Sequence, residues 1–458
     1  MSQRKLRGDV DMTCGSVAGH LIRFAFPLLL GNLFQQLYNM VDTWVVGNFV
    51  GNEAFSAVGS VGPIVNMLIG FFGGLASGAG VVISQYYGAK RPDAVRRAVH
   101  TSLVMTLVMG VLFTGLGLWM TPTMLRFMKT PDEVLPQSTA YLNIYFVGVL
   151  GLMLYNMGAG ILRAVGDSKR PFYFLVVCAI LNIVLDLFFV LYCDMGVRGV
   201  ALATVLSQGV SAVLVILALL RTDSCIRLDW RALAVHWDIL KKIIQVGIPA
   251  AIQMAITAFS NIFVQSYINH FGADCMSGWT AYSKLDQLLF LPMQSLALAA
   301  TTFVGQNLGS SQVDRAKKGV RMASMLAIVV TAVLILSLII PLAPYLVIFF
   351  NSKPEVVEYG TMFLRYISPF YVLCSLNQVY GAALRGAGHS KATMFIMLGS
   401  FVVFRQIYLY VVANFISNTV MPIAMGYPAG WFLCSTLTLI YYHHADLNRN
   451  TVLENKGQ

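Results

Sequence analysis

Apolar stretches long enough to cross a lipid bilayer recur along the whole chain. A membrane-spanning helix needs about 20 predominantly apolar residues, and of the 458 residues here 57% are hydrophobic and only 11% are charged. Hydropathy indicates twelve such stretches, near residues 21–46, 55–82, 99–122, 137–161, 171–193, 198–220, 241–267, 277–304, 319–343, 359–383, 392–415 and 423–442. Because the apolar runs are continuous and not alternating, we expect an all-α integral membrane protein and not a membrane β-barrel. Gly70, Gly74 and Gly78 recur every four residues in the second stretch, which suits close helix contact, and Pro369 interrupts the tenth, where we expect a kink or hinge.

Lysine and arginine residues gather in alternate loops, on one side of the expected membrane. They cluster near residues 90–97, 163–170, 221–242, 315–321 and 385–391, whereas the opposite loops hold few. The positive-inside rule therefore places both termini in the cytoplasm, as for a multi-pass protein of a bacterial inner membrane. It also explains the net charge of +11 without nucleic acid as a partner. The first 20 residues lack the apolar core of a signal peptide, so we expect the first span to stay in the protein.

Motifs of catalysis and of metal binding are missing from the sequence. The seven cysteines are scattered and form no Cys-x-x-Cys pair, so we expect neither a disulfide framework nor a metal site built on them. The chain has no Gly-x-Ser-x-Gly, His-Glu-x-x-His or phosphate-binding loop. We therefore expect a protein that is not an enzyme and that needs no cofactor.

The second half of the chain repeats the first at an offset of 222 residues. Pro27 corresponds in this way to Pro249, and Asn39 corresponds to Asn261. Two loop motifs repeat as well: the Leu-Arg-x-x-Gly-x-Ser-Lys segment at 162–169 matches 384–391 at the same offset, and residues 85–89 match 306–310 at an offset of 221. Six spans lie in each repeat, so the repeats have the same orientation. This predicts two homologous six-helix bundles, 1–230 and 231–458, related by a pseudo-two-fold axis along the membrane normal.

These paired prolines and loops resemble those of the multidrug and toxic compound extrusion (MATE) family, over residues 15 to 445. The resemblance implies an antiporter that exports organic, often cationic, compounds in exchange for inward-moving protons or sodium. Flippases for lipid-linked precursors belong to the wider superfamily and are the alternative. A flippase would need several basic residues in its cavity to hold a pyrophosphate, and the deep basic candidates are few: Lys284, Arg365 and Arg405.

Three acidic residues, Asp42, Asp186 and Asp286, lie well inside the expected spans. A charged residue at the bilayer centre costs roughly 2.5–3.5 kcal/mol on insertion scales and usually faces a protein interior or a water-filled cavity. Spacings of three and four residues place Gln35, Tyr38, Asn39 and Asp42 near one face of the first helix. For Gln35 and Asn39, polar packing between helices is an equally good interpretation. We propose this face as part of a substrate cavity.

Asp186 shares a helix face with Asn182, four residues earlier, and the next span carries Thr204 and Gln208. The resemblance assigns the coupling ion to such residues: a DinF-like branch uses an aspartate in span one, an Asn-x-x-x-Asp pair in span five and a threonine in span six. Asp42, Asn182, Asp186 and Thr204 match those positions. Oxygen atoms of this kind suit sodium, whereas a proton needs only a carboxylate, and both ions stay open. A purely structural Asn182–Asp186 pair is the alternative.

The second half departs from this pattern, because Val264 and Tyr408 stand at the positions of Asp42 and Asp186. A NorM-like branch carries acids in spans seven and ten, and this chain has none there. Span seven instead presents a neutral polar stripe. The remaining candidates for the substrate cavity are Gln208, Gln253, Thr257, Asn261, Asp286 and Arg405. We expect a monomer in the lipid bilayer whose partners are small organic molecules.

Overall fold

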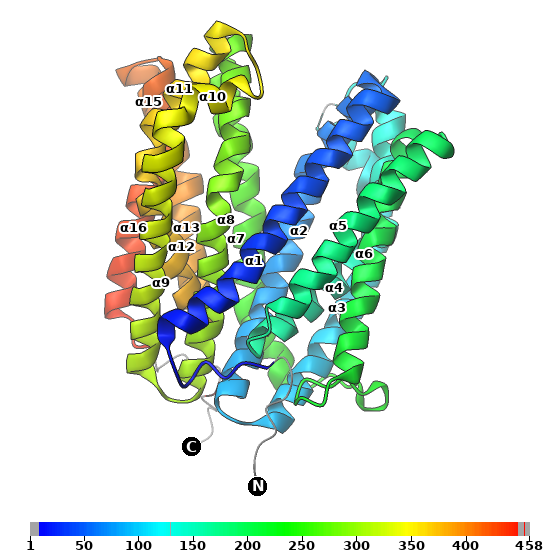
Figure 1. Cartoon of the computed structure of the whole chain (residues 1–458), viewed down its shortest axis with the longest axis vertical. Helices are drawn as coiled ribbons and strands as arrows, with labels where there is room; N and C mark the ends of the chain where they lie inside the picture. The colour runs from blue at the N-terminus through cyan, green and yellow to red at the C-terminus, as the bar shows by residue number, and fades with distance from the viewer. Residues whose placement is uncertain (1–8, 129, 448–452, 454–458) are drawn as a thin grey trace. The chain divides into compact units, whose positions relative to one another are not determined.

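The structure is a computed structural model that describes residues 9–128, 130–447 and 453, and most of these residues lie in helices (Figure 1). The helices of the first half are α1 (Val17–Val45), α2 (Asn52–Gly88), α3 (Pro92–Phe127), α4 (Leu135–Ala164), α5 (Lys169–Leu187) and α6 (Gly196–Arg221). Single π-helical segments continue α1 through Val46–Val50 and α5 through Phe188–Tyr192. A 3-10 turn, Trp230–Ala232, follows in the linker.

The second half contains two long helices, α7 and α8, followed by helices several of which join end to end into spans. They are α7 (Trp237–Asn269), α8 (Ala273–Gly309), α9 (Val313–Leu334), α10 (Ile340–Ile348), α11 (Pro354–Ile367), α12 (Tyr371–Gly386), α13 (Ser390–Leu398), α14 (Arg405–Val411), α15 (Val420–Ala424) and α16 (Gly426–His444). The joints inside spans are π-helical at Ile335–Ile339, Gly399–Phe404 and Val412–Ile416. Each of the twelve expected stretches corresponds to one span, so the all-helical fold class is confirmed.

The tenth span is interrupted at the residue that the sequence marks for a break. Eleven described helices are individually long and apolar enough to cross a membrane. The remaining span consists of α11 and α12, which a 3-10 turn, Ser368–Phe370, separates. Pro369 lies in that turn, where it has no N–H for a helical hydrogen bond and where its ring conflicts with the preceding turn. The expected interruption at Pro369 is therefore confirmed.

The repeated Leu-Arg-x-x-Gly loops are helix caps of the same geometry in both halves. After α4, the N–H of Gly166 donates to Arg163 at 2.9 Å, and the next N–H donates to Leu162 at 3.0 Å. After α12, Gly388 and the following residue make the same two bonds, at 2.9 and 2.8 Å. Gly166 and Gly388 have φ values of 87° and 92°, which favour glycine. The repeated motif thus encodes a Schellman cap.

By their contacts, the described residues form two compact units. The first unit contains Pro27–Ala251 with the described residues up to Asp11, and the second contains Met12–Phe26 with the described residues from Ile252 onward. Besides the change between Asp11 and Met12, which precedes α1, the changes of unit fall at or just after a repeated proline, inside α1 and α7, and not in the linker near residue 230. The division into bundles at residues 230 and 231 stays a prediction.

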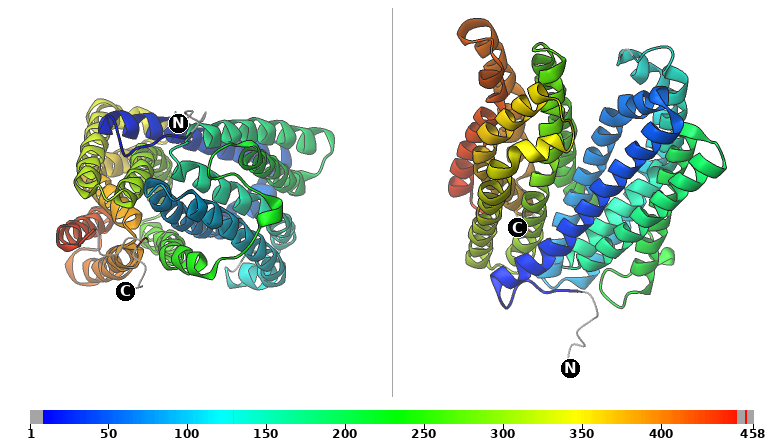
Figure 2. Two further views of the ribbon diagram at one scale, coloured as in Figure 1. Left: turned by 90° about the horizontal axis from the view of Figure 1, so that it is seen from below. Right: turned by 45° about the horizontal axis from the view of Figure 1, so that its top comes forward.

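Helix α4 is central to the first unit. It packs against α2, α3 and α6, and α6 in turn packs against α5; these helices run side by side in Figure 2. The hydrophobic core of the unit includes Leu142, Phe146 and Val149 of α4, each at most 1% exposed. In the second unit, α8 packs against α9, α11 and α12, and α12 also packs against α16.

Two glycines of α2 allow close contact with the first half of α7. A Cβ atom added at Gly74 would lie 2.4 Å from Cα of Ala251, and one added at Gly78 would lie 2.3 Å from Cα of Gly247. The four-residue spacing of small residues therefore brings two backbones together, as expected from the sequence. This contact explains why α7 begins in the first unit.

We predict that Gly78→Leu destabilises the protein, because its side chain would collide with the backbone of α7. Overpacking of this kind typically costs about 1–3 kcal/mol. Gly62→Leu is the matched control in the same helix, since no neighbouring atom lies within 4 Å of a Cβ there. The measurement is the thermal midpoint of each detergent-solubilised variant. Equal midpoints for the two variants would contradict the close approach of α2 and α7.

Candidate functional site

Helix α1 presents two of its expected polar residues to the interior of the first unit. Tyr38 is 5% exposed and Asp42 is 8% exposed, so both side chains are buried. Gln35, one turn before Tyr38, is half-buried, whereas Asn39 is exposed. A helix turns by about 100° per residue, and Asn39 therefore lies to the side of the face that Tyr38 and Asp42 form. Its place in a substrate cavity stays a prediction.

The side chain of Asp42 lies near that of Asp186 from α5, close enough for the two carboxyl groups to interact electrostatically. Asp186 and Asn182, one turn apart on α5, are both fully buried, at 0% exposed. Neither acid takes part in an ion pair among the described residues. The structure thus brings together the two acids that the sequence selected from different spans.

Most polar side-chain atoms of the acid pair and of Asn182 have no hydrogen-bond partner among the described residues. They are Oδ1 of Asp42, both carboxylate oxygens of Asp186, and both amide atoms of Asn182. A buried polar group without a partner costs free energy, and a buried charge costs more. Two adjacent carboxylates in such surroundings stay ionised together only when a cation is bound between them. Without a cation, one of them holds a proton. The unpartnered oxygens are also hard donors of the type that sodium binds, so the residues fit either ion.

Tyrosines of α4 form the wall beside the acid pair. Tyr141 lies beside both carboxyl groups and beside Thr204 of α6, whose hydroxyl donates to the Val200 carbonyl at 3.0 Å. Tyr145, one turn further along α4, stacks on Tyr141 with ring centroids 6.5 Å apart. The sequence analysis missed both tyrosines. Their spacing of four residues in the middle of an apolar span is the signal that could have identified them.

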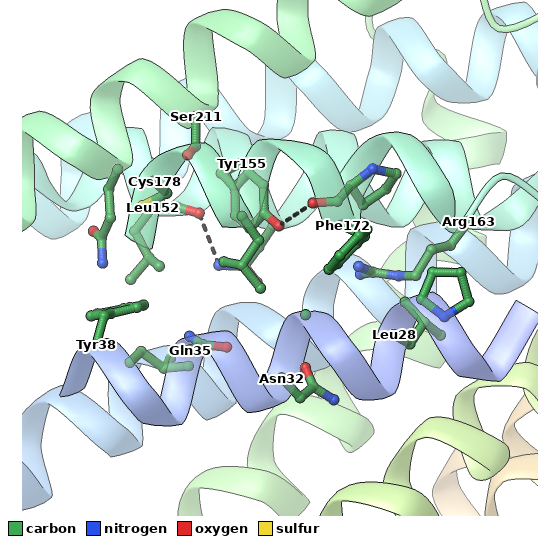
Figure 3. A pocket seen from close by; sticks show the side chains of 17 residues that line it. Leu28, Asn32, Gln35, Tyr38, Leu152, Tyr155, Arg163, Phe172, Cys178 and Ser211 are labelled. Carbon is green, nitrogen blue, oxygen red and sulfur yellow. Dashed lines mark hydrogen bonds between the residues drawn. The ribbon is translucent and has the colours of Figure 1, made fainter. Parts of the chain in front are cut away.

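A pocket of about 130 Å³ adjoins this site within the first unit. Helices α1, α4, α5 and α6 supply most of its lining (Figure 3). Gln35, Tyr38 and Gln208, three of the expected cavity residues, line it. Tyr38 and another lining residue, Cys178, interact electrostatically with Asp42, so one end of the pocket lies near the acid pair.

The neutral polar stripe of α7 lies in the second unit, where one of its residues contacts a buried arginine; the stripe consists of Gln253, Thr257, Asn261 and Gln265. Arg405 of α14 is 3% exposed, and its Nη2 donates to Ser260 at 2.7 Å and to Asn261 at 2.9 Å. Its guanidinium also lies over the ring of Tyr427, 4.8 Å from the centroid. The partners of this deep cation are therefore neutral groups and an aromatic ring. No acid forms an ion pair with it among the described residues.

Two further residues of the stripe, Gln253 and Thr257, come earlier along α7 than the residues that contact Arg405. Gln253 is buried and Thr257 is half-buried. Gln253 is 7% exposed and donates from Nε2 to the sulfur of Met397 at 2.7 Å. The hydroxyl of Thr257 is buried without a hydrogen-bond partner among the described residues. The positions that match the acid pair hold Val264, which is fully buried, and Tyr408, whose hydroxyl donates to Pro422 at 3.0 Å.

Asp286 of α8 has partners of its own in the second unit. The hydroxyl of Tyr371 donates to its Oδ1, and the hydroxyl of Tyr282 approaches the same atom at 3.5 Å. The two hydroxyl groups also lie 3.1 Å apart. Asp286 is therefore hydrogen-bonded within an aromatic core that includes Trp279 and Phe363, unlike the acid pair of the first unit.

Comparison with known proteins supports this arrangement of two repeats. The MatE family model matches residues 27–188 and again residues 249–411, so its two matches begin 222 residues apart. The chain is similar to the probable multidrug resistance protein YpnP of Bacillus subtilis, at 28% identity over 438 residues, which cover 95% of this chain and 96% of the relative. It is also similar to the probable multidrug resistance protein YoeA of the same organism, at 29% identity over 430 residues and 92% of each chain.

Among solved structures, the chain resembles an outward-facing conformation of a multidrug resistance MATE family transporter of the MOP superfamily. The TM-score is 0.90 at 23% sequence identity, over 96% of this chain and 98% of that chain. At this identity the likeness shows the fold alone. Together, the double match of the family model, which covers more than half of the residues, and the twelve helical spans show that the chain belongs to the MatE family of multi-pass membrane transporters.

Proposed function

We propose that the protein is a secondary active antiporter that exports organic, cationic or amphipathic compounds in exchange for protons or sodium. The observation that carries this proposal is the proximity of the buried carboxyl groups of Asp42 and Asp186, whose oxygens largely lack hydrogen-bond donors among the described residues. Such a pair binds a small cation when one is supplied and is left with uncompensated negative charge when the cation leaves. The relatives named for multidrug resistance support export of compounds as the activity.

Coupling requires that the ion and the exported compound bind differently to the states of one protein. A ligand shifts a conformational equilibrium only by its difference in affinity for the states, and this coupling is reciprocal between two ligands. The pocket that begins near Asp42 supplies the second binding place within the same unit. An organic cation near the pair and a bound ion would each neutralise the same carboxylates. We therefore infer that they compete.

The residue pattern favours a DinF-like over a NorM-like coupling site. The acids that meet one another lie in the first unit, whereas Val264 and Tyr408 occupy the matching positions of the second. The buried guanidinium of Arg405 further disfavours binding of a second cation in its surroundings. We also infer a monomer in a bacterial plasma membrane with both termini in the cytoplasm, from the distribution of lysine and arginine.

We predict that Asp42→Asn and Asp186→Asn each abolish gradient-driven export while the protein remains folded. The amide keeps the shape of the side chain but removes the charge that binds a proton or sodium. Asp286→Asn is the matched control, because its carboxyl is held by tyrosine hydroxyls, and it should reduce export less. The measurement is dye efflux from proteoliposomes under an imposed ion gradient. Export by Asp42→Asn at the wild-type rate would refute the coupling site.

The identity of the coupling ion is tested by Asn182→Ala and Thr204→Ala. If sodium couples transport, loss of either oxygen removes a ligand and should raise the sodium concentration that gives half-maximal export by several-fold. If protons couple transport, which we favour because carboxylates alone suffice, both variants should keep most of their export. Efflux rates are compared at fixed pH with sodium or potassium outside. A loss of proton-driven export in both variants would contradict the proton assignment.

Expression of the protein in a bacterial host that lacks its own efflux pumps should lower the accumulation of cationic dyes. Export by the antiporter removes dye from the cytoplasm, whereas a flippase for lipid-linked precursors would not. The measurement is whole-cell dye fluorescence, with the Asp42→Asn/Asp186→Asn double variant as the control at matched membrane levels. Unchanged accumulation across a broad panel of dyes would favour the flippase alternative.

A further inference from the structure

Arg163 is the one charged residue among those that line the pocket of the first unit. It lies in the last turn of α4, immediately before the Schellman cap at Gly166. Figure 3 shows its side chain extending into the pocket, where Leu28 and Phe172 are drawn beside it. The sequence analysis placed Arg163 among the cytoplasmic basic residues and assigned it no role in a site.

The guanidinium of Arg163 has no ion pair within the part of the chain that the structure describes. The acid closest to it in sequence, Asp167, is bonded to Arg170 instead, and Asp9 also pairs with Arg170, at 3.8 Å. Tyr155, which lies beside Arg163, directs its hydroxyl hydrogen to the Pro171 carbonyl at 3.1 Å. Arg163 is half-buried, and a partly desolvated guanidinium is stabilised most by an anion with which it can form charge-assisted, bidentate hydrogen bonds.

The size of the pocket limits what this cation can bind. Its volume of about 130 Å³ is close to that of the roughly 150 Å³ cavity that admits a benzene molecule. Phe172 and Tyr155 supply aromatic surface next to Arg163. The pocket therefore suits a ring-sized group that carries an acid, and not a whole bulky compound.

The two ends of the pocket have opposite electrostatic character. Leu28 lies near Arg163, and Tyr38 lies near Asp42. The ten residues between Leu28 and Tyr38 on α1 correspond to about 15 Å along a helix axis. A positive group thus stands at one end of the pocket and the acid pair stands beyond the other.

We propose that Arg163 binds the carboxylate of an end group on an amphipathic substrate, whose remaining, cationic part extends toward the acid pair. This assignment rests on the proposed export function and names a substrate class for it: compounds that carry both a carboxylate and a basic group. Arg163 then determines specificity for the acidic end, whereas Asp42 and Asp186 respond to the coupling ion and to the cationic end.

A purely structural role for Arg163 makes a different prediction, because the chain contains its repeat equivalent. Arg385 precedes the matching cap at Gly388, where its carbonyl accepts the same hydrogen bond at 2.9 Å. It is 8% exposed and does not line the pocket. If the arginine serves only to end the helix, substitutions of Arg163 and Arg385 should have equal effects on ligand binding.

The test compares binding of a rhodamine that bears a free carboxylate with binding of the methyl ester of the same dye. Binding to the full-length protein in neutral detergent is measured by fluorescence polarisation without an ion gradient. Wild type and Arg385→Gln should prefer the carboxylate form. Arg163→Gln should lose affinity for it by about tenfold or more, as for a hydrogen-bonded charge, and should keep its affinity for the ester.

Asn32→Asp provides a second variant of nearly unchanged shape, in case Arg163→Gln does not fold. Asn32 lines the same pocket, and a carboxylate there would repel the acidic dye, so the preference should again disappear. Equal binding of the two dyes by wild type, or a preference that survives both variants, would overturn the assignment. Gradient-driven export of the ester by wild type, measured in parallel, would show that the antiport proposal stands even in that case.

Discussion

Two carboxyl groups, those of Asp42 and Asp186, lie near each other inside the first unit, and no basic side chain of the described residues forms an ion pair with either. Taking a carboxylate out of water costs several kcal/mol, and a second one beside it adds repulsion. The surrounding helices must hold this pair in place. Tyr141 and Thr204 from α4 and α6 lie beside it, and the close packing of α4 with its neighbours fixes their positions. A bound cation or proton would relieve this cost, and we therefore propose that the pair responds to an ion gradient.

The two repeats share the geometry of their helix caps but differ in the polar residues that they bury. The caps after α4 and α12 have the same hydrogen bonds and the same left-handed glycine. In contrast, Val264 and Tyr408 replace the acid pair in the second unit, which buries Arg405 against Ser260, Asn261 and Tyr427 instead. In our proposal, the first half responds to the ion gradient through its acid pair. The second half instead keeps the buried positive charge of Arg405.

The sequence was sufficient for the features that depend on local patterns. Continuous apolar runs predicted the twelve spans, and Pro369 predicted the break in the tenth. Gly74 and Gly78 predicted a close helix contact. The resemblance to a DinF-like branch implied the grouping of Asp42 with Asp186, and the cost of burying an acid inside a membrane span drew attention to each of them. The helices extend beyond the apolar runs, because hydropathy detects the membrane interior and not the polar turns in which helices end.

Features that depend on packing between distant helices were not accessible from the sequence. Tyr141 and Tyr145 look like ordinary aromatic residues until α4 is placed beside α1 and α5. Arg163 belongs to the Leu-Arg-x-x-Gly motif, and the glycine of this motif accounts for the helix cap after α4. Nothing in the motif indicates that the arginine side chain enters a pocket. The first half of α7 belongs to the first unit because its backbone closely approaches the glycines of α2. The composition of the linker does not indicate this contact.

The central claim is that the coupling ion and the exported compound compete at the acid pair. The most direct measurement is the affinity of the detergent-solubilised protein for a cationic dye across a range of pH and sodium concentration. The account predicts that wild-type affinity falls as the coupling ion increases, whereas the Asp42→Asn/Asp186→Asn double variant shows a nearly flat response. An equally steep dependence in the double variant would contradict the account, because the ion would then act elsewhere.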